Sequence, residues 1–278
     1  MSIICSTSFH EHPKFIMEHY LNWDAAFQGG MTYVAHFSAN TRSDMLNSAA
    51  KDNIILSAPN FVINQKSIYT KFGTSLPMHL LNYEFSKCIG INPSYLYITS
   101  PQSFAIRTGL SKYVRMFDIG IKQASFGLDK WYWEAAAKED PRISELTKYL
   151  NIPEPFISRV DGAFIRADIF EEMIDIIMKF WSFDEIMNLN PIYPLEELVI
   201  PTIAKSLFDH NVRIADTRSK VGGGEELTPS QIHESINRGY DFSVKRIYQS
   251  RTSESRKIVL SHLPGRDILK NYNTPTEI

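Results

Sequence analysis

The first hundred residues alternate apolar runs of strand length with helical patterns, and this alternation limits the folds that the chain can adopt. A strand that is followed by a helix and then by another strand favours parallel pairing, with the helices packed on the faces of the sheet. We therefore predict an α/β fold with a mostly parallel central sheet flanked by helices. The predicted strands are residues 2–9, 31–38, 52–58 and 94–100, and the predicted helices are residues 14–27 and 75–90.

The second half of the chain is more helical. Residues 216–230 contain three consecutive glycines among charged side chains, which predicts a loop. The 278 residues contain no clear linker or internal repeat, so we predict a single domain over residues 1–278. Amphipathic helices are predicted at 140–150, 168–183 and 196–211, and further strands at 158–167 and 243–249.

The charge balance and the cysteine content exclude several classes of protein. The formal net charge is −2, so no general field attracts the chain to nucleic acid, and we predict no nucleic-acid partner. The two cysteines, Cys5 and Cys88, belong to no ligand cluster, which argues against a disulfide framework or a zinc site. No signal-peptide pattern and no run of about 18 apolar residues is visible, so we expect a soluble, cytoplasmic protein.

Three loops follow predicted strands at the sheet edge where α/β proteins bind their ligands, at residues 8–13, 37–44 and 99–107. In the first loop, His10 and His12 stand on either side of Glu11. Such alternation can hold a metal ion, but no third ligand is visible, so we interpret this stretch as a polar loop and predict no metal site. The chain also lacks the nucleotide-binding patterns GxxxxGK[ST] and GxGxxG.

Two adjacent carboxylates, Glu196 and Glu197, open a helical run just after Pro194. Acidic residues in a first helical turn are stabilised by the helix dipole, which explains the pair without any function. A carboxylate whose pKa is raised toward neutrality can also serve as a general base. Both interpretations remain open at this point.

Two further stretches have a functional and a structural interpretation. The aromatic run WYWEAA at 131–136 suits stacking on a sugar or a base, but such clusters more often belong to the core, so we favour the structural role. Near the C-terminus, cations are concentrated in a chain of net charge −2, which suits diphosphate recognition or a solvated basic face. These cations are Lys245, Arg246, Arg251, Arg256 and Lys257.

Several short motifs, in order along roughly residues 2–250, resemble the core-2/I-branching β-N-acetylglucosaminyltransferases, a family of inverting GT-A glycosyltransferases. Phe72-Gly73 stands where the family has Trp-Gly, and residues 99–104 (TSPQSF) stand where it has a Ser-Gly-x-Asp-x-Pro loop. Residues 160–177 resemble its glycine-containing strand and the following helix. Within PLEELVIPT, Glu197 and Thr202 keep the family's Glu-to-Thr spacing, and FSVKRI places Lys245 at its diphosphate-contacting lysine.

The resemblance implies a GT-A-like fold and a sugar transfer that inverts the anomeric centre. The donor would be a nucleotide-sugar and the acceptor a glycan or glycolipid, in the synthesis of surface polysaccharide or lipopolysaccharide. The family lacks the metal-binding DxD motif, as this chain does on its strand ends, so we expect a metal-independent reaction with no cofactor besides the donor substrate. Residues 1–120 would bind the nucleotide, and residues 121–278 the acceptor and the diphosphate. Peripheral membrane association through the acceptor is a further expectation, and the oligomeric state is left open.

The resemblance also implies roles for individual residues. Glu197 would be the general base, and like-charge repulsion from Glu196 would raise its pKa. Lys245, helped by Arg246 or Arg251, would neutralise the departing diphosphate, with Arg256 and Lys257 as weaker candidates. The strand-end loops contribute His10, His36 and Ser38 for the nucleoside, and Ser100 and Gln102 for the donor sugar.

Two alternatives belong to other classes. The first is a non-catalytic protein that binds nucleotide or carbohydrate on a GT-A-like fold. The second is a metal-dependent GT-A transferase whose acidic ligand lies outside a formal DxD motif.

Overall fold

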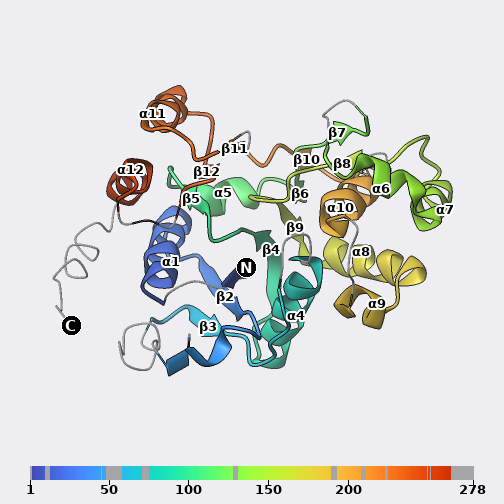
Figure 1. Ribbon diagram of the computed structural model, residues 1–278, viewed down its shortest axis with the longest axis horizontal. Coiled ribbons are helices and arrows are strands. Elements are labelled where there is room, and N and C mark those ends of the chain that lie inside the picture. Colours follow the sequence, from blue (N-terminus) through green and yellow to red (C-terminus); the bar gives the residue numbers. More distant parts are fainter. Residues whose placement is uncertain are drawn as a thin grey trace.

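A computed structural model describes residues 2–9, 13–44, 46–47, 58–70, 75–127, 131–188, 193–207, 211–222, 225–248, 250 and 252–263. Its centre is a sheet of seven strands in the order β10-β6-β9-β4-β1-β2-β3 (Figure 1). The strands are β1 (Ser2–Phe9), β2 (Met31–Phe37), β3 (Phe61–Ile63), β4 (Pro93–Ile98), β6 (Ile119–Gly120), β9 (Phe164–Arg166) and β10 (Ile214–Ala215).

Most of the strand pairs in this sheet are parallel, as predicted. β1 pairs in parallel with both β2 and β4, β2 with β3, and β6 with β10, whereas β9 is antiparallel to β4 and β6. The chain runs from β1 outward to β2 and β3, and β4 then lies on the opposite side of β1. The strand order therefore reverses between β1 and β4.

Helices cover both faces of the sheet, because successive side chains of a strand point to opposite sides. On one face, Ile3 and Cys5 of β1 pack in a cluster with α1 (Pro13–Phe27), and on the other face Ile4 packs with α4 (Ser75–Cys88) and α8 (Ala167–Phe180). Figure 1 shows α1 on one side of β1 and β4, with α4 and α8 on the other. Both faces are buried, so the strands read as continuous apolar runs.

Two smaller sheets and the remaining helices complete the described part of the structure. A three-stranded sheet, β11-β12-β5, lies beneath α11 and α12 around a small apolar cluster that includes Phe104 and Val244 (Figure 1). None of the described helices has the length and apolar character that crossing a bilayer requires. The remaining elements are β5 (Ser103–Ala105), α5 (Leu110–Val114), β7 (Ala124–Ser125), α6 (Glu134–Glu139), α7 (Pro141–Tyr149), β8 (Phe156–Ile157), α9 (Phe183–Asn188), α10 (Leu195–Ser206), β11 (Ser219–Val221), α11 (Pro229–Arg238), β12 (Ser243–Lys245) and α12 (Glu254–His262).

The structure confirms the predicted α/β class and corrects several boundaries. The predicted strand at 52–58 falls almost entirely outside the described residues, and β3 lies a few residues later. Only β9 forms within the strand predicted at 158–167, because the N–H of Ser158 donates to Glu197 in α10 and residues 161–162 form a turn. The loop predicted at 216–230 contains β11, which pairs in parallel with β12. Two of its three consecutive glycines, at 223 and 224, lie outside the described residues.

Arg256 has a structural role rather than the phosphate-binding role that its sequence context allowed. Its guanidinium, 3 % exposed, donates to one oxygen of Glu18 at 2.6 and 3.1 Å. It also stacks between the rings of Phe15 and Phe104. The contact ties α12 to α1, whereas Lys257 is exposed and pairs with Glu254 in its own helix.

We expect Arg256→Met to lower the free energy of unfolding by about 3–5 kcal/mol, because it leaves the Glu18 carboxylate buried without its counter-charge. The exposed pair supplies the matched control, since Lys257→Met should cost less than about 1 kcal/mol. Denaturant titrations of the two variants test this. Equal losses in both variants would show that the Glu18 pair does not hold α12 in place.

Candidate functional site

A crevice of about 410 Å³ opens at the carboxyl ends of β1 and β4, where the strand order reverses. Open α/β sheets bind their ligands at such a point because the loops on either side diverge there. Its polar lining comes from both halves of the chain. The polar residues are Ser8, Asn40, Thr70, Ser75, His79, Thr99, Ser100, Gln102, Asp161, Glu196, Glu197 and Lys245.

Helix α1 braces the loop that follows β4. His19 donates from Nε2 to the Ser100 carbonyl oxygen at 2.9 Å, and the hydroxyl of Tyr33 lies 2.5 Å from its Nδ1. Burial lowers the pKa of His19 to about 3, so the ring is neutral at pH 7. Asn22 bonds both the N–H and the carbonyl of Ala105 through its amide. These contacts fix the segment 100–105, of which residues 100–102 line the crevice.

A neutral imidazole lies at the opposite wall. His79, on α4, is 2 % exposed, and its Nδ1 lies 2.8 Å from the hydroxyl oxygen of Ser6. Asn82 donates to the same oxygen at 2.9 Å. Burial lowers the pKa of His79 to about 3. This side of the crevice therefore presents uncharged hydrogen-bonding groups, which suit hydroxyls and carbonyls of a ligand.

Asp161 and Lys245 form an ion pair at the centre of the crevice lining. The Asp161 side chain is 6 % exposed and that of Lys245 is 20 % exposed. Ser103 donates its hydroxyl to Asp161 at 2.9 Å. Burial alone would raise the pKa of Asp161, but the charge of Lys245 and the hydrogen bonds outweigh it and hold that pKa below its ordinary value. The Asp161 carboxylate is therefore ionised at neutral pH.

Glu197 lies in the first turn of α10 and is held by contacts on both sides. The indole N–H of Trp131 donates to its Oε2 at 2.8 Å, and its backbone carbonyl accepts from the N–H of Ser158 at 2.9 Å. One turn and a half later, the hydroxyl of Thr202 accepts from the N–H of Phe156 at 2.9 Å and donates to the carbonyl of that residue at 3.1 Å. Through these hydrogen bonds, Glu197 and Thr202 attach α10 to the segment that carries Asp161.

The two adjacent glutamates face different surroundings, since neighbouring positions on a helix do not face each other. Ser75 donates to Oε1 of Glu196 at 2.6 Å, and the Glu196 side chain is almost fully buried. Burial raises the pKa of both carboxyls. For Glu197, the Trp131 N–H and the charges of Arg159 and Lys245 oppose this rise. The charge of Glu197 raises the pKa of Glu196, so the two carboxylates do repel each other, and the charge of Asp161 raises the pKa of Glu197.

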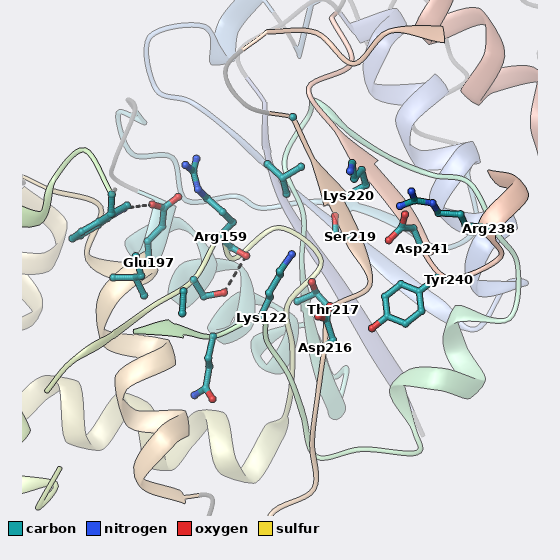
Figure 2. A pocket seen from close by; sticks show the side chains of 17 residues that line it. Lys122, Arg159, Glu197, Asp216, Thr217, Ser219, Lys220, Arg238, Tyr240 and Asp241 are labelled. Atoms are coloured by element: carbon teal, nitrogen blue, oxygen red, sulfur yellow. Dashed lines mark hydrogen bonds between the residues drawn. The ribbon is translucent and has the colours of Figure 1, made fainter. Parts of the chain in front are cut away.

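A second cavity of about 590 Å³ lies on the other side of Glu197 (Figure 2). Of the residues that the structure describes, Glu197 alone belongs to the linings of both cavities. Figure 2 shows Glu197 at one end of this hollow and Arg238, Tyr240 and Asp241 at the other. The polar lining is Lys122, Gln123, Trp131, Ser158, Arg159, Glu197, Asp216, Thr217, Ser219, Lys220, Arg238, Tyr240 and Asp241.

The structure brings five of the predicted site residues together in the crevice, and it places three others elsewhere. His36 is fully buried in β2 and lies 3.3 Å from the backbone of Ile68. Ser38 donates to Asn40, which lines the crevice, at 2.5 Å. Arg246 lines neither cavity. His10 and Arg251 lie outside the described residues. The five that meet are Ser100, Gln102, Glu196, Glu197 and Lys245.

Three residues of the site were not predicted from the sequence as site residues. Asp161 was included in a predicted strand, although the Asp-Gly pair marks a turn. His79 was assigned to a helix face, and its role depends on the distant Ser6. Trp131 was assigned to the core, where it does lie, yet its indole N–H reaches Glu197. The sequence signals were present for Asp161 and Trp131, but not for His79.

The chain matches no protein-family model and no curated protein. Among solved structures, the galactosyltransferase LgtC in complex with donor and acceptor sugar analogs is 10% identical, with a TM-score of 0.44 over 95% of this chain and 96% of that one. A nucleoside-diphosphate-sugar pyrophosphorylase from Vibrio cholerae RC9 is 9% identical, with a TM-score of 0.46 over 84% of this chain and 99% of that one. The apo glycosyltransferase GlyE of Streptococcus pneumoniae TIGR4 is 8% identical, with a TM-score of 0.43 over 98% of this chain and 62% of that one. Likeness at this level assigns no activity to the chain.

Gly162 fixes the turn that presents Asp161, and we expect Gly162→Ala to destabilise it. The φ of Gly162 is +82°, and an added Cβ would lie 3.1 Å from the Cβ of Ser219. Gly90 is the matched control, because its φ is +83° but nothing lies within 4 Å of an added Cβ. Both alanine variants should lose about 1 kcal/mol to backbone strain, and Gly162→Ala should lose more. Equal denaturation midpoints would mean that the Ser219 contact does not constrain the turn.

Proposed function

We propose that the protein is an inverting glycosyltransferase that binds a nucleotide-sugar in the crevice and an acceptor in the second cavity. The observation that carries this proposal is the position of Glu197, whose side chain lines both cavities. A transferase needs a base at the point where its two substrates meet. The crevice at the strand reversal suits the nucleotide, as it does in other open α/β sheets.

Glu197 would act as the general base of a single displacement. Its carboxylate takes the proton of an acceptor hydroxyl, whose oxygen forms a bond to the anomeric carbon of the donor sugar. The bond from that carbon to the diphosphate breaks at the same time, and the nucleoside diphosphate leaves with the electron pair. Burial raises the pKa of Glu197 and so strengthens it as a base.

Lys245 supports the departure of the diphosphate, because its ammonium lines the crevice and Asp161 holds it in place. A cation at this point stabilises the charge that develops on the leaving group. Glu197 lines the second cavity as well as the crevice, whereas Lys245 lines the crevice alone. Attack and departure from opposite sides of the anomeric carbon invert its configuration, which is why we propose inversion.

The resemblance to the core-2/I-branching transferases supports the same proposal. The motifs that carry it lie far apart in the sequence, yet Ser100, Gln102, Glu197 and Lys245 from three of them line one crevice. The glycan or glycolipid nature of the acceptor, and a role in surface polysaccharide synthesis, are carried over from that resemblance. So is the GT-A-like character of the fold.

A metal-dependent transferase is the alternative that the crevice favours next, because Asp161, Glu196 and Glu197 all line it. Within the described ranges, no group of three His, Cys, Asp or Glu side chains is arranged to hold a metal ion. We expect the rate of sugar transfer to be unchanged in EDTA, since Lys245 supplies the positive charge. A rate that is abolished by EDTA and restored by Mn²⁺ would favour the alternative.

We expect Glu197→Gln to lower kcat by about 10²- to 10⁴-fold, because the amide cannot accept the acceptor proton. The affinity for the nucleoside diphosphate should stay unchanged, and this separates lost chemistry from lost folding. A panel of nucleotide-sugars and acceptors, with titration of each diphosphate by calorimetry, supplies both measurements. A variant that keeps its turnover would remove Glu197 from the mechanism. Diphosphate binding by a wild-type protein that transfers no sugar to any acceptor would favour the non-catalytic alternative.

The pH dependence gives an independent test of the same base. Transfer should fall as the pH drops through the raised pKa of Glu197, because only the carboxylate accepts a proton. The Trp131 N–H stabilises that carboxylate, so Trp131→Phe should raise its pKa and move the acid limb of kcat to higher pH. An acid limb that stays in place or moves to lower pH would contradict the assignment.

A further inference from the structure

The second cavity contains three cations that have no carboxylate partner among the described residues: Lys122, Arg159 and Lys220. We propose that its ligand carries an anionic group, a phosphate or a carboxylate, that these three side chains bind. The inference rests on the proposed function only where it calls this ligand the sugar acceptor. It defines the acceptor class as an acidic saccharide.

The other two cations that line the cavities each form an ion pair within the protein. Lys245 pairs with Asp161, and Arg238, at the far end of the second cavity, pairs with Glu234 at 2.5 Å. Lys122, Arg159 and Lys220 lack such pairs in the described part of the chain, so their charge is available to a ligand.

The three cations reach one hollow from separate parts of the fold. Lys122 follows β6, Arg159 lies between β8 and β9, and Lys220 is on β11. Figure 2 shows all three around the space between Glu197 and the Arg238 end of the cavity. A solvated basic face usually comes from one side of one helix or strand. Convergence from three segments is instead the arrangement expected of a binding site.

The acids of the cavity offset the charge of the three cations only in part. Asp216 accepts from the backbone N–H of Arg218 at 2.7 Å and so stabilises its own turn. Asp241 lies beside Arg238 at the far end (Figure 2), where burial raises its pKa and the charges of Lys220 and Lys122 oppose that rise. Glu197 is the proposed base, which must meet a hydroxyl rather than the anion. The anionic group therefore belongs between the two ends of the cavity.

An anion at this place also affects the base. The charge of Arg159 lowers the pKa of Glu197 and so weakens it. A ligand anion that pairs with Arg159 offsets that charge and restores the basicity of Glu197. An acidic acceptor thus assists the removal of its own proton, whereas a neutral acceptor leaves Arg159 to oppose it.

The test compares monosaccharides as matched sets of neutral sugar, 6-phosphate and uronic acid. Affinity is measured by calorimetry in the presence of a nucleoside diphosphate, at fixed ionic strength. The variants are Lys122→Met and Lys220→Met, and the control is Lys112→Met, an exposed lysine on α5 that lines neither cavity. A melting temperature for each variant confirms that it is folded.

We expect at least one charged form to bind about 10- to 100-fold more tightly than its neutral counterpart, which is the effect of one charge-assisted hydrogen bond or more. The two lysine variants should lose this preference, and Lys112→Met should keep it. The 6-phosphate and uronic acid arms identify which anion is bound.

Equal affinity for neutral and charged sugars, or a preference that survives both lysine substitutions, would overturn the proposal. So would a loss of nucleoside diphosphate affinity in the same variants, because the cations would then belong to the donor. Charged sugars that bind as expected but receive no sugar from any donor would support the anion site and contradict the proposed transfer. A failure of the anion site can therefore be distinguished from a failure of the proposed sugar transfer.

Discussion

The attachment of α10 to the segment 156–161 is the constraint on which the rest of the site depends. Thr202 bonds both backbone groups of Phe156, and the carbonyl of Glu197 accepts from Ser158. These contacts place Glu197 at the boundary of two cavities and carry Asp161 into the crevice. Without them, the first turn of α10 would still be a helix start, but it would face no ligand site.

Burial has opposite consequences for the two carboxylates of this junction. Asp161 lies beside Lys245, and the attraction outweighs the desolvation of its charge, so its pKa falls. The partners of Glu197 are weaker, and its pKa rises. A low dielectric thus produces one permanent anion, which orients a lysine, and one carboxylate poised to exchange a proton. The difference between them comes from their neighbours and not from residue type.

Apolar periodicity predicted β1, β2, β4, α1 and α4, because both faces of the sheet are buried and the helices pack on it. The strand order implied by this pattern pointed to the loops at the carboxyl ends of the strands, whereas the choice of Glu197 and Lys245 came from the family resemblance. The apolar pattern could not predict contacts between residues that are distant in the sequence. Arg256 was one of the weaker candidates for binding phosphate. Its actual partner, Glu18, lies in a helix near the other end of the chain, so the sequence pattern gave no sign of the pair. The glycine-rich stretch appeared as a loop because β11 is short and depends on pairing with β12.

Crystallography of the protein with a bound nucleoside diphosphate tests the central claim most directly, since Glu197 is proposed to separate the donor from the acceptor. The account predicts electron density for the diphosphate in the crevice, beside the ammonium of Lys245, with the nucleoside between the ends of β1 and β4. Nucleotide density in the second cavity, against Lys122 and Lys220, would contradict it. In that case the two cavities would exchange their proposed roles, and Glu197 would face the leaving group instead of the attacking hydroxyl.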